Sequence, residues 1–151
     1  MKTVKRDRLT IAESSHPFIR LSAKIVRHIR HELEPLHFEC IPGCSDCCHP
    51  TPWSIWEYNQ LNPNERAIAE TYRQGDTRCP FSSGAGCQCY HQRPVTCRLY
   101  GVTGALRCPH GRGPKRLLTK RQARRLMERY WELVREEKKI IAVVKEKNKG
   151  E

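Results

Sequence analysis

Cys40-Ile41-Pro42-Gly43-Cys44-Ser45-Asp46-Cys47-Cys48 places four thiols within nine residues, and the fold of the chain depends on this stretch. Pro42 and Gly43 bend the backbone between the first two cysteines, so the thiols converge in a way that a bound metal would explain. The other cysteines all follow downstream: Cys79, Cys87, Cys89, Cys97 and Cys108. Every thiol therefore lies between residues 40 and 108, and this clustering predicts a metal site.

The chain has 151 residues, which is a single-domain length with room for one modest core. Hydrophobic residues make up 38% of it, and they gather mainly in two terminal stretches around a loop-like, cysteine-rich middle. A middle this poor in apolar residues needs a bound metal to hold it together. We therefore expect a small metal-stabilised single domain.

The cysteine count and the N-terminal sequence predict a cytoplasmic protein. Nine cysteines is an odd number, so full disulfide pairing is impossible. The charged start, residues 1–8, has no apolar run behind it that could serve as a signal peptide, and no stretch approaches the length of a membrane span. In the reducing cytosol, clustered cysteines more often bind metal or perform redox chemistry than form disulfides.

Two amphipathic helices are predicted, one near each end of the chain. Apolar residues recur at three- and four-residue steps from Pro17 to Leu33, and Pro35 stops this first helix. A capping box at Thr119-Lys120-Arg121-Gln122 starts the second helix, which runs to about Lys147 with apolar residues close to a heptad spacing. We expect this long C-terminal helix to pack against the N-terminal helix. A homodimer seam is the alternative.

Short helices and loops are predicted between these two helices. Ser54-Ile55-Trp56-Glu57 is a capping box for a helix through Leu61, and Asn62-Pro63-Asn64-Glu65 repeats the signal for a helix through about Tyr72. Residues 79–114 are rich in Gly, Pro, Ser and Cys, which is typical of loops shaped by ligands, and no alternating run predicts a strand. The predicted fold class is mostly α with irregular cysteine-rich loops.

The predicted organisation has four parts within one domain. Residues 1–16 form a flexible N-terminus, and residues 17–114 form a cysteine-cluster metal-binding domain that includes the N-terminal helix. Residues 115–147 form a basic amphipathic helix of the same domain, and residues 148–151 form a tail.

The net charge of +12 is concentrated at the C-terminus. Residues 109–151 contain 14 of the 28 basic residues and 6 of the 16 acidic ones, which leaves a net charge of +8 on this segment. A basic helix face can hold nucleic acid or an acidic protein. The candidate residues for such docking are Lys115, Arg116, Lys120, Arg121, Arg124, Arg125 and Arg129.

The spacing of the first four cysteines favours an iron–sulfur cluster, of the 4Fe–4S type, over zinc. Structural zinc sites usually take two separated Cys-x2-Cys pairs, whereas several cysteines in one short loop are typical of ferredoxin-like cluster binding. Zinc remains the alternative. Cys47 and Cys48 are adjacent, and neighbouring side chains tend to diverge, so one of the two is expected to serve a second centre or to be a free redox thiol.

The full cysteine pattern resembles a known family. Cys40-x3-Cys44-x2-Cys47-Cys48 is followed in order by Cys79-Pro80-Phe81 and by Cys87-x2-Tyr90-x2-Arg93-Pro94-x2-Cys97-Arg98-x-Tyr100. Over residues 40–100 this resembles the bacterial and archaeal cysteine-cluster family described as zinc- or iron-chelating proteins. The resemblance implies that the metal-binding positions are Cys40, Cys44, Cys47, Cys48, Cys79, Cys87 and Cys97.

The resemblance also suggests an activity. Larger relatives of the family include flagellin lysine N-methylases, so it implies an iron–sulfur cluster together with S-adenosylmethionine-dependent methylation of a protein substrate. Two features depart from the family. Cys89 stands where an apolar residue is usual, and the chain is short, with no extra domain for a substrate.

Several further residues are candidates for the site. Arg93 and Arg98 are predicted to bind a cofactor or to support the thiolates, because a guanidinium can donate hydrogen bonds to sulfur or clamp a carboxylate. Cys108, which precedes a proline, is a candidate eighth metal ligand. Three histidines beside cysteines could also complete a site: His49, His91 and His110.

Two functions from different classes follow from these features. The first is a cytosolic metal- or cluster-binding protein that acts in redox chemistry or in cofactor-dependent modification of another protein. As an enzyme it would be an iron–sulfur-dependent oxidoreductase or an S-adenosylmethionine-dependent protein methyltransferase. The second is a structural zinc module whose basic C-terminal helix binds nucleic acid or an acidic protein partner. The oligomeric state is predicted to be monomer or homodimer.

Overall fold

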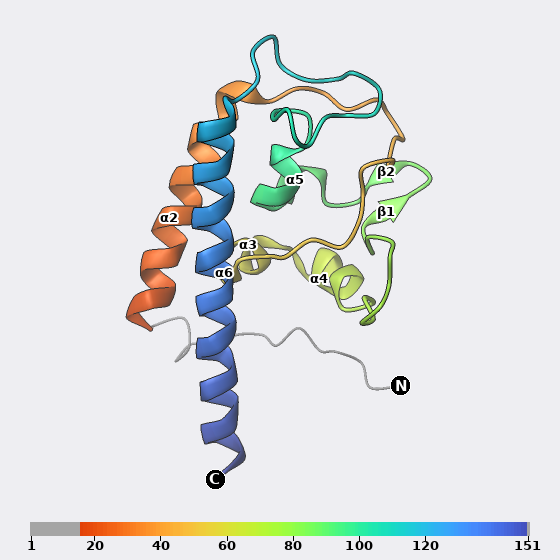
Figure 1. The fold of residues 1–151 in the computed structure, drawn as a ribbon. Helices are drawn as coiled ribbons and strands as arrows, with labels where there is room; N and C mark the ends of the chain where they lie inside the picture. Colours follow the sequence, from red (N-terminus) through yellow and green to blue (C-terminus); the bar gives the residue numbers. More distant parts are fainter. Residues whose placement is uncertain (1–15, 151) are drawn as a thin grey trace.

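The structure is a computed structural model that describes residues 16–150, so the predicted flexible N-terminus lies outside it except for its last residue. Two antiparallel helices lie side by side along one flank of the molecule, α2 (Pro17–Leu33) and α6 (Lys120–Lys149) (Figure 1). The predicted fold class is confirmed, because the domain is mostly helical and its long C-terminal helix contacts the N-terminal helix.

Each of these helices begins where the sequence predicts it. Pro17 occupies the first turn of α2, and the His16 ring nitrogen Nδ1 accepts a hydrogen bond from the Phe18 amide at 3.1 Å. The capping box that starts α6 is complete, with Thr119 and Gln122 satisfying each other's backbone amides. The chain leaves α2 through a short 3₁₀ helix, η1 (Glu34–Leu36).

The main apolar cluster lies between α2, α6 and the short helix α5 (Val95–Leu99). Burial of one aliphatic side chain of this kind contributes roughly 1.5–3 kcal/mol, so this cluster is a main source of apolar stabilisation. The members of this cluster are Val26, Ile29, Leu33, Val95, Leu99, Val102, Leu126, Tyr130, Leu133 and Val134.

Both predicted short helices between them are present, as α3 (Ile55–Gln60) and α4 (Pro63–Ala69), and both begin with the predicted capping boxes. Helix α4 ends three residues before the expected Tyr72. The physical reason is that the backbone tightens to bonds between residues three apart, as in the 3.3 Å bond from the Tyr72 amide to the Ala69 carbonyl.

A small hairpin, which the sequence does not predict, follows these helices. Strands β1 (Ser82–Ser83) and β2 (Gly86–Cys87) pair antiparallel, and a 3₁₀ helix, η2 (Tyr90–Gln92), leads from them to α5. Strands of two residues are too short to show an alternating pattern. A second apolar cluster lies near this hairpin and comprises Tyr58, Leu61, Ala69, Phe81 and Cys89.

Two glutamates are buried where the helices meet. Glu57 lies in the first turn of α3 and accepts hydrogen bonds from Tyr130 of α6 and from the Val95 amide of α5. Glu137 lies in α6, where its Oε2 accepts a 2.9 Å hydrogen bond from the Ile55 amide and its Oε1 contacts the Ser22 hydroxyl of α2. Burial raises the pKa of Glu137 to about 7.

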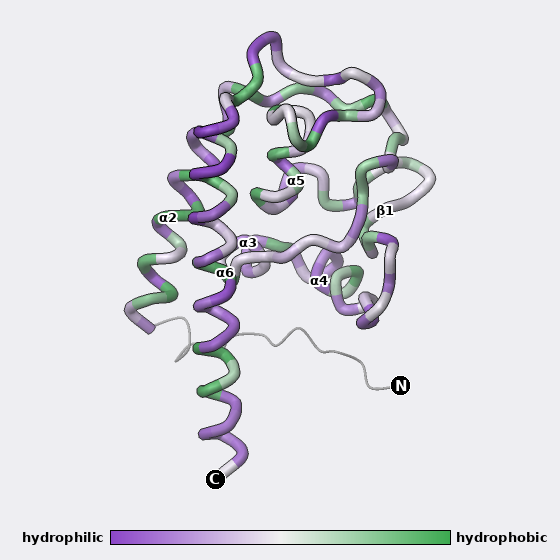
Figure 2. The backbone as a smooth tube through the Cα atoms, in the orientation of Figure 1, coloured by the Kyte–Doolittle hydropathy of each residue, from purple (hydrophilic) through white to green (hydrophobic). Residues whose placement is uncertain are grey.

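The C-terminal part of α6 continues beyond the level at which α2 starts (Figure 1). It ends at Lys149, two residues past the predicted end. Figure 2 shows a hydrophobic segment in this lower part, where Val143 is 52% exposed. The homodimer seam stays a prediction. Within residues 16–150, none of the helices combines the length and the apolar character that a membrane crossing requires.

Candidate metal centre

The loop from Cys40 to Cys48 consists of two successive turns. The Cys44 amide donates to the Ile41 carbonyl at 3.0 Å, and Gly43 has a φ of +78°, which a side chain would disfavour. The Cys48 amide donates to the Ser45 carbonyl at 3.0 Å. The predicted bend is confirmed, and each turn ends on a cysteine.

The β1–β2 hairpin packs directly on this loop. A Cβ added at Gly86, whose φ is +101°, would lie 3.6 Å from the Gly43 Cα atom, and one at Gly43 would lie 3.5 Å from the Gly84 carbonyl oxygen. Both distances are ordinary van der Waals contacts, so the positive φ of each residue, and not a lack of space, favours glycine here. Cys87 is thereby brought to the Cys40–Cys48 loop.

Eight of the nine cysteines line one cavity of about 280 Å³. They comprise the seven positions that the family resemblance implies, together with Cys89. Soft thiolate donors suit zinc and iron–sulfur clusters. The space is several times the roughly 30 Å³ share of one water molecule, so it exceeds the room that a single ion needs. The lining thiols are Cys40, Cys44, Cys47, Cys48, Cys79, Cys87, Cys89 and Cys97.

The thiols include two hydrogen-bonded pairs. A hydrogen bond with the Cys48 thiol lowers the pKa of Cys47 to about 6, although burial opposes the shift. The sulfurs of Cys87 and Cys89 lie 3.8 Å apart, and the hydrogen bond between them lowers the pKa of Cys87 to about 6. In each pair the pKa of the other thiol is raised. Each pair thus presents one thiolate near neutral pH, the form that binds metal.

Cys47 and Cys48 do not diverge as the sequence suggests. Both line the same cavity, because the turn that ends at Cys48 curls the backbone around it. Cys89, whose role the sequence leaves open, also contributes to the cavity although it is buried among apolar side chains. No signal in the sequence distinguishes it from a spare thiol.

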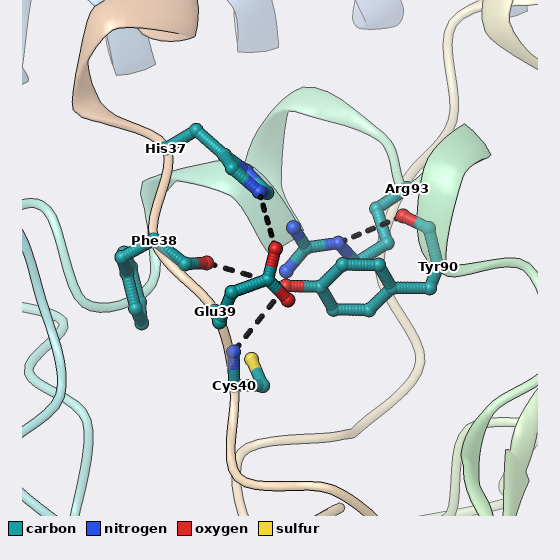
Figure 3. Close-up of polar contacts among 6 residues, drawn as sticks. All are labelled: His37, Phe38, Glu39, Cys40, Tyr90 and Arg93. Carbon is teal, nitrogen blue, oxygen red and sulfur yellow. Dashed lines mark hydrogen bonds and ion pairs between the residues drawn. The ribbon is translucent and has the colours of Figure 1, made fainter.

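Arg93 also lines the cavity and stacks on Tyr90 (Figure 3). Its guanidinium carbon lies 3.9 Å from the centre of the Tyr90 ring, and its Nε donates to the Tyr90 carbonyl at 3.0 Å. The hydrogen bond within each thiol pair is the largest cause of the lowered pKa of Cys47 and Cys87, and burial opposes it. The positive charge of Arg93 adds a smaller lowering of both pKa values. Arg93 is therefore placed to balance the charge of bound thiolates.

Tyr90 connects this arginine to the start of the cysteine loop. As Figure 3 shows, its hydroxyl donates to the Phe38 carbonyl at 3.3 Å and accepts from the Cys40 amide at 3.4 Å. Burial raises the pKa of Tyr90, so it remains a neutral donor.

Arg98 does not line the cavity. Its Nε donates to the Arg93 carbonyl at 2.9 Å and its Nη2 donates to the His91 carbonyl at 2.8 Å. Burial, with the nearby charges of Arg30 and Arg93, lowers the pKa of Arg98 to about 10. Arg98 thus holds the backbone that carries Arg93, while binding of a cofactor by either arginine stays a prediction.

Thr51 and Trp53 also border the cavity. Thr51 Oγ1 lies 3.6 Å from the Cys97 sulfur, whose pKa burial raises to about 12. Trp53 lines the cavity and packs on Phe81 with ring centres 5.8 Å apart, which shields one side from water. An aromatic residue beside a cysteine site is typical of such shielding, whereas an isolated threonine such as Thr51 carries no pattern that could reveal its position in advance.

The candidate histidines and Cys108 have different surroundings. His49 lines the cavity, and its Nε2 lies 3.2 Å from the Tyr100 hydroxyl. His91 packs edge-on against Tyr90 and does not line the cavity. Cys108 lies outside the lining as well, so its role as an eighth ligand stays a prediction.

Comparison with known proteins agrees with this geometry. A family model described as "CxxCxxCC: Putative zinc- or iron-chelating domain" matches residues 39–130, which include every cysteine of the cavity. A search of curated proteins and a search of solved structures each gave no match.

Proposed function

Because the chain belongs to the cysteine-cluster family of zinc- or iron-chelating domains, we propose that it holds an iron–sulfur cluster in the eight-thiol cavity and acts as a cytoplasmic redox protein. The observation that carries this proposal is the number of thiols around one space. A structural zinc ion takes four ligands, whereas the cavity offers twice that number. A bound cluster would accept one electron from a donor and pass it to an acceptor.

The residues around the cavity fit this role. Cys47 and Cys87 supply thiolates near neutral pH, and Arg93 offsets their negative charge. Hydrogen bonds and positive charge near cluster sulfurs tune the reduction potential. Trp53 limits the access of water from one side.

Electron transfer is favoured over methyl transfer by the size of the cavity. Sites for drug-sized ligands usually measure roughly 300–1,000 Å³. A cavity of about 280 Å³ that already holds a cluster leaves little room for S-adenosylmethionine. Methylation of a protein substrate would therefore need a second binding surface.

Metal analysis of protein purified without oxygen tests this proposal. We expect a brown protein with iron and acid-labile sulfide, and loss of both in the Cys47→Ser and Cys87→Ser double variant. Cys108→Ser tests the remaining candidate ligand: its thiol lies outside the cavity, so we expect this variant to keep its colour. A colourless wild-type protein with stoichiometric zinc and no sulfide would refute the proposal.

A structural zinc module with a basic docking helix is the second candidate. The observation that favours it is a row of exposed cations in the first turns of α6, among them Arg121, Arg124 and Arg125. Next to them, a groove of about 780 Å³ lies between α6 and residues 103–107 and contains Trp131, which is 45% exposed. Cations beside an exposed aromatic ring suit nucleic acid or an acidic protein.

Charge reversal tests this second candidate. Replacing Arg121, Arg124 and Arg125 with glutamate should abolish retention on immobilised nucleic acid at low salt. Reversal of three lysines near the far end of the same helix is the control of equal charge: Lys145, Lys147 and Lys149. Equal retention of both triple variants and the wild type would dispose of nucleic-acid docking.

A further inference from the structure

Three side chains of different chemistry meet beside the cavity: Cys44, Asp46 and His110. The Cys44 sulfur, a carboxylate oxygen of Asp46 and a ring nitrogen of His110 all lie within 4.8 Å of one another. They come from two segments that lie 64 residues apart in sequence. Thiolate, carboxylate and imidazole are the donor types that proteins offer to zinc.

Local turns position the backbone of the three residues that carry these donors. Cys44 and Asp46 belong to the two turns of the Cys40–Cys48 loop. His110 lies in a turn that the Gly111 amide closes on the Cys108 carbonyl at 3.1 Å, and the His110 amide also donates to the Cys108 sulfur at 3.4 Å. His110 Nε2 then reaches the Asp46 carboxylate and forms a short hydrogen bond with it.

The distances suit a single metal ion. With zinc bonds of about 2.3 Å to sulfur and about 2.0–2.2 Å to nitrogen or oxygen, tetrahedral donors lie roughly 3.3–3.7 Å apart. Contacts to the sulfur need to close by about 1 Å at most from the 4.8 Å limit, and the hydrogen-bonded Asp46 and His110 atoms need to move apart so that an ion fits between them. The Asp46 and His110 side chains are 59% and 39% exposed, so they can adjust and leave a coordination position open to water.

We propose that Cys44, Asp46 and His110 form a mononuclear zinc site at the rim of the cavity, separate from the centre inside it. A hydrogen bond between the histidine and the aspartate alone would be an exposed pair of small energetic value, and it would leave the position of the thiol unexplained. Assigning Cys44 to the rim still leaves seven thiols around the cavity, more than a four-thiolate centre requires. The rim site therefore does not depend on what fills the cavity.

Anaerobic zinc titration of the full chain tests this inference. We expect His110→Ala and Asp46→Asn each to bind one zinc ion fewer than the wild type, or to bind it at least about tenfold more weakly, since loss of even an indirect ligand contact costs about that much. His31→Ala is the matched control, because His31 forms an exposed pair with Glu34 at 3.2 Å as part of α2. The control should bind zinc as the wild type does.

Zinc-edge X-ray absorption supplies a second readout. The wild type loaded with zinc should show an imidazole contribution that His110→Ala lacks.

Unchanged zinc stoichiometry and affinity in both rim variants would overturn the proposal. Iron and sulfide content, measured on the same variants, should stay at the wild-type level, so failure of the rim site and failure of the cavity proposal are told apart. Asp46→Asn preserves side-chain shape at an exposed position and serves as the variant that keeps the fold.

Discussion

The hydroxyl of Tyr130 donates a 2.6 Å hydrogen bond to Oε2 of Glu57, and both side chains are fully buried. The other oxygen of this carboxylate accepts a 2.8 Å bond from the Val95 amide, the first residue of α5. Since α5 also carries Cys97, one glutamate connects the C-terminal helix to a thiol of the cavity.

Tyr130→Phe should lower the free energy of unfolding by about 1.5–3 kcal/mol, because it removes a hydrogen bond to a buried carboxylate. Denaturant unfolding measures this loss. Trp131→Phe, one residue further along α6 and 45% exposed in the wild type, should change stability far less. Equal effects of the two substitutions would contradict the importance of the Tyr130–Glu57 contact.

Glu137 should make stability depend on pH. Burial raises its pKa from 4.5 to about 7, so the folded protein keeps a proton that the unfolded chain releases as the pH rises through this window. The contribution is fully present below about pH 4.5 and is lost between pH 4.5 and 7, by about 3 kcal/mol. A single hydroxyl proton on Ser22 cannot serve both the Ile19 carbonyl and Glu137, so a proton on Glu137 lets both contacts be hydrogen bonds.

Glu137→Gln isolates this group from the other titrating residues. The glutamine amide can reproduce the protonated form, so the variant should match the wild type near pH 4 and be more stable at pH 8. The comparison is made by denaturant unfolding at a series of pH values. Parallel curves for the two proteins would show that Glu137 titrates normally.

Gly101→Ala should destabilise the protein by about 2–4 kcal/mol, from backbone strain together with overpacking. Gly101 has a φ of +83°, and a Cβ there would clash with Cζ of the Phe38 ring. Gly104→Ala is the control, since its φ is not positive and a Cβ there would meet no atom within 4 Å. Thermal unfolding of both variants tests the difference, and similar melting temperatures would count against it.

Arg93→Gln should weaken metal binding by the cavity about tenfold at pH 7, because the guanidinium charge helps to lower the pKa of Cys47 and Cys87. Competition with a chelating dye measures the affinity, and the deficit should shrink as the pH rises and the thiols ionise without help. Arg107→Gln removes an exposed charge outside the cavity and should bind metal normally. A deficit that does not depend on pH would point to a structural role for Arg93.

Local signals in the sequence predict most of the helical framework. Capping boxes depend on residues three apart, so Ser54 with Glu57 and Thr119 with Gln122 mark helix starts without reference to the rest of the chain. The same pattern cannot show that the second oxygen of Glu57 reaches α5. That contact depends on tertiary packing across 38 residues.

The candidate site is predictable in its membership but not in its arrangement. The family resemblance implies seven positions that all line the cavity, whereas cysteine spacing alone does not show which thiols lie together. The contact between Asp46 and His110 joins distant loops, and nothing in either segment points to the other. The burial of Glu137 has a sequence signal that is recognised only once the structure is known. Glu137 occupies a position of the heptad pattern, between Leu133 and Ile140, where an apolar residue is expected.

The tie between α6 and Glu57 bears on how the protein matures. During synthesis all nine cysteines are added to the chain before Tyr130 and Glu137, because they precede residue 109. The nascent chain therefore carries its reduced thiols before α6 is present to contact α3 and α5. Metal delivery to the growing polypeptide can thus occur before the last helix closes the fold.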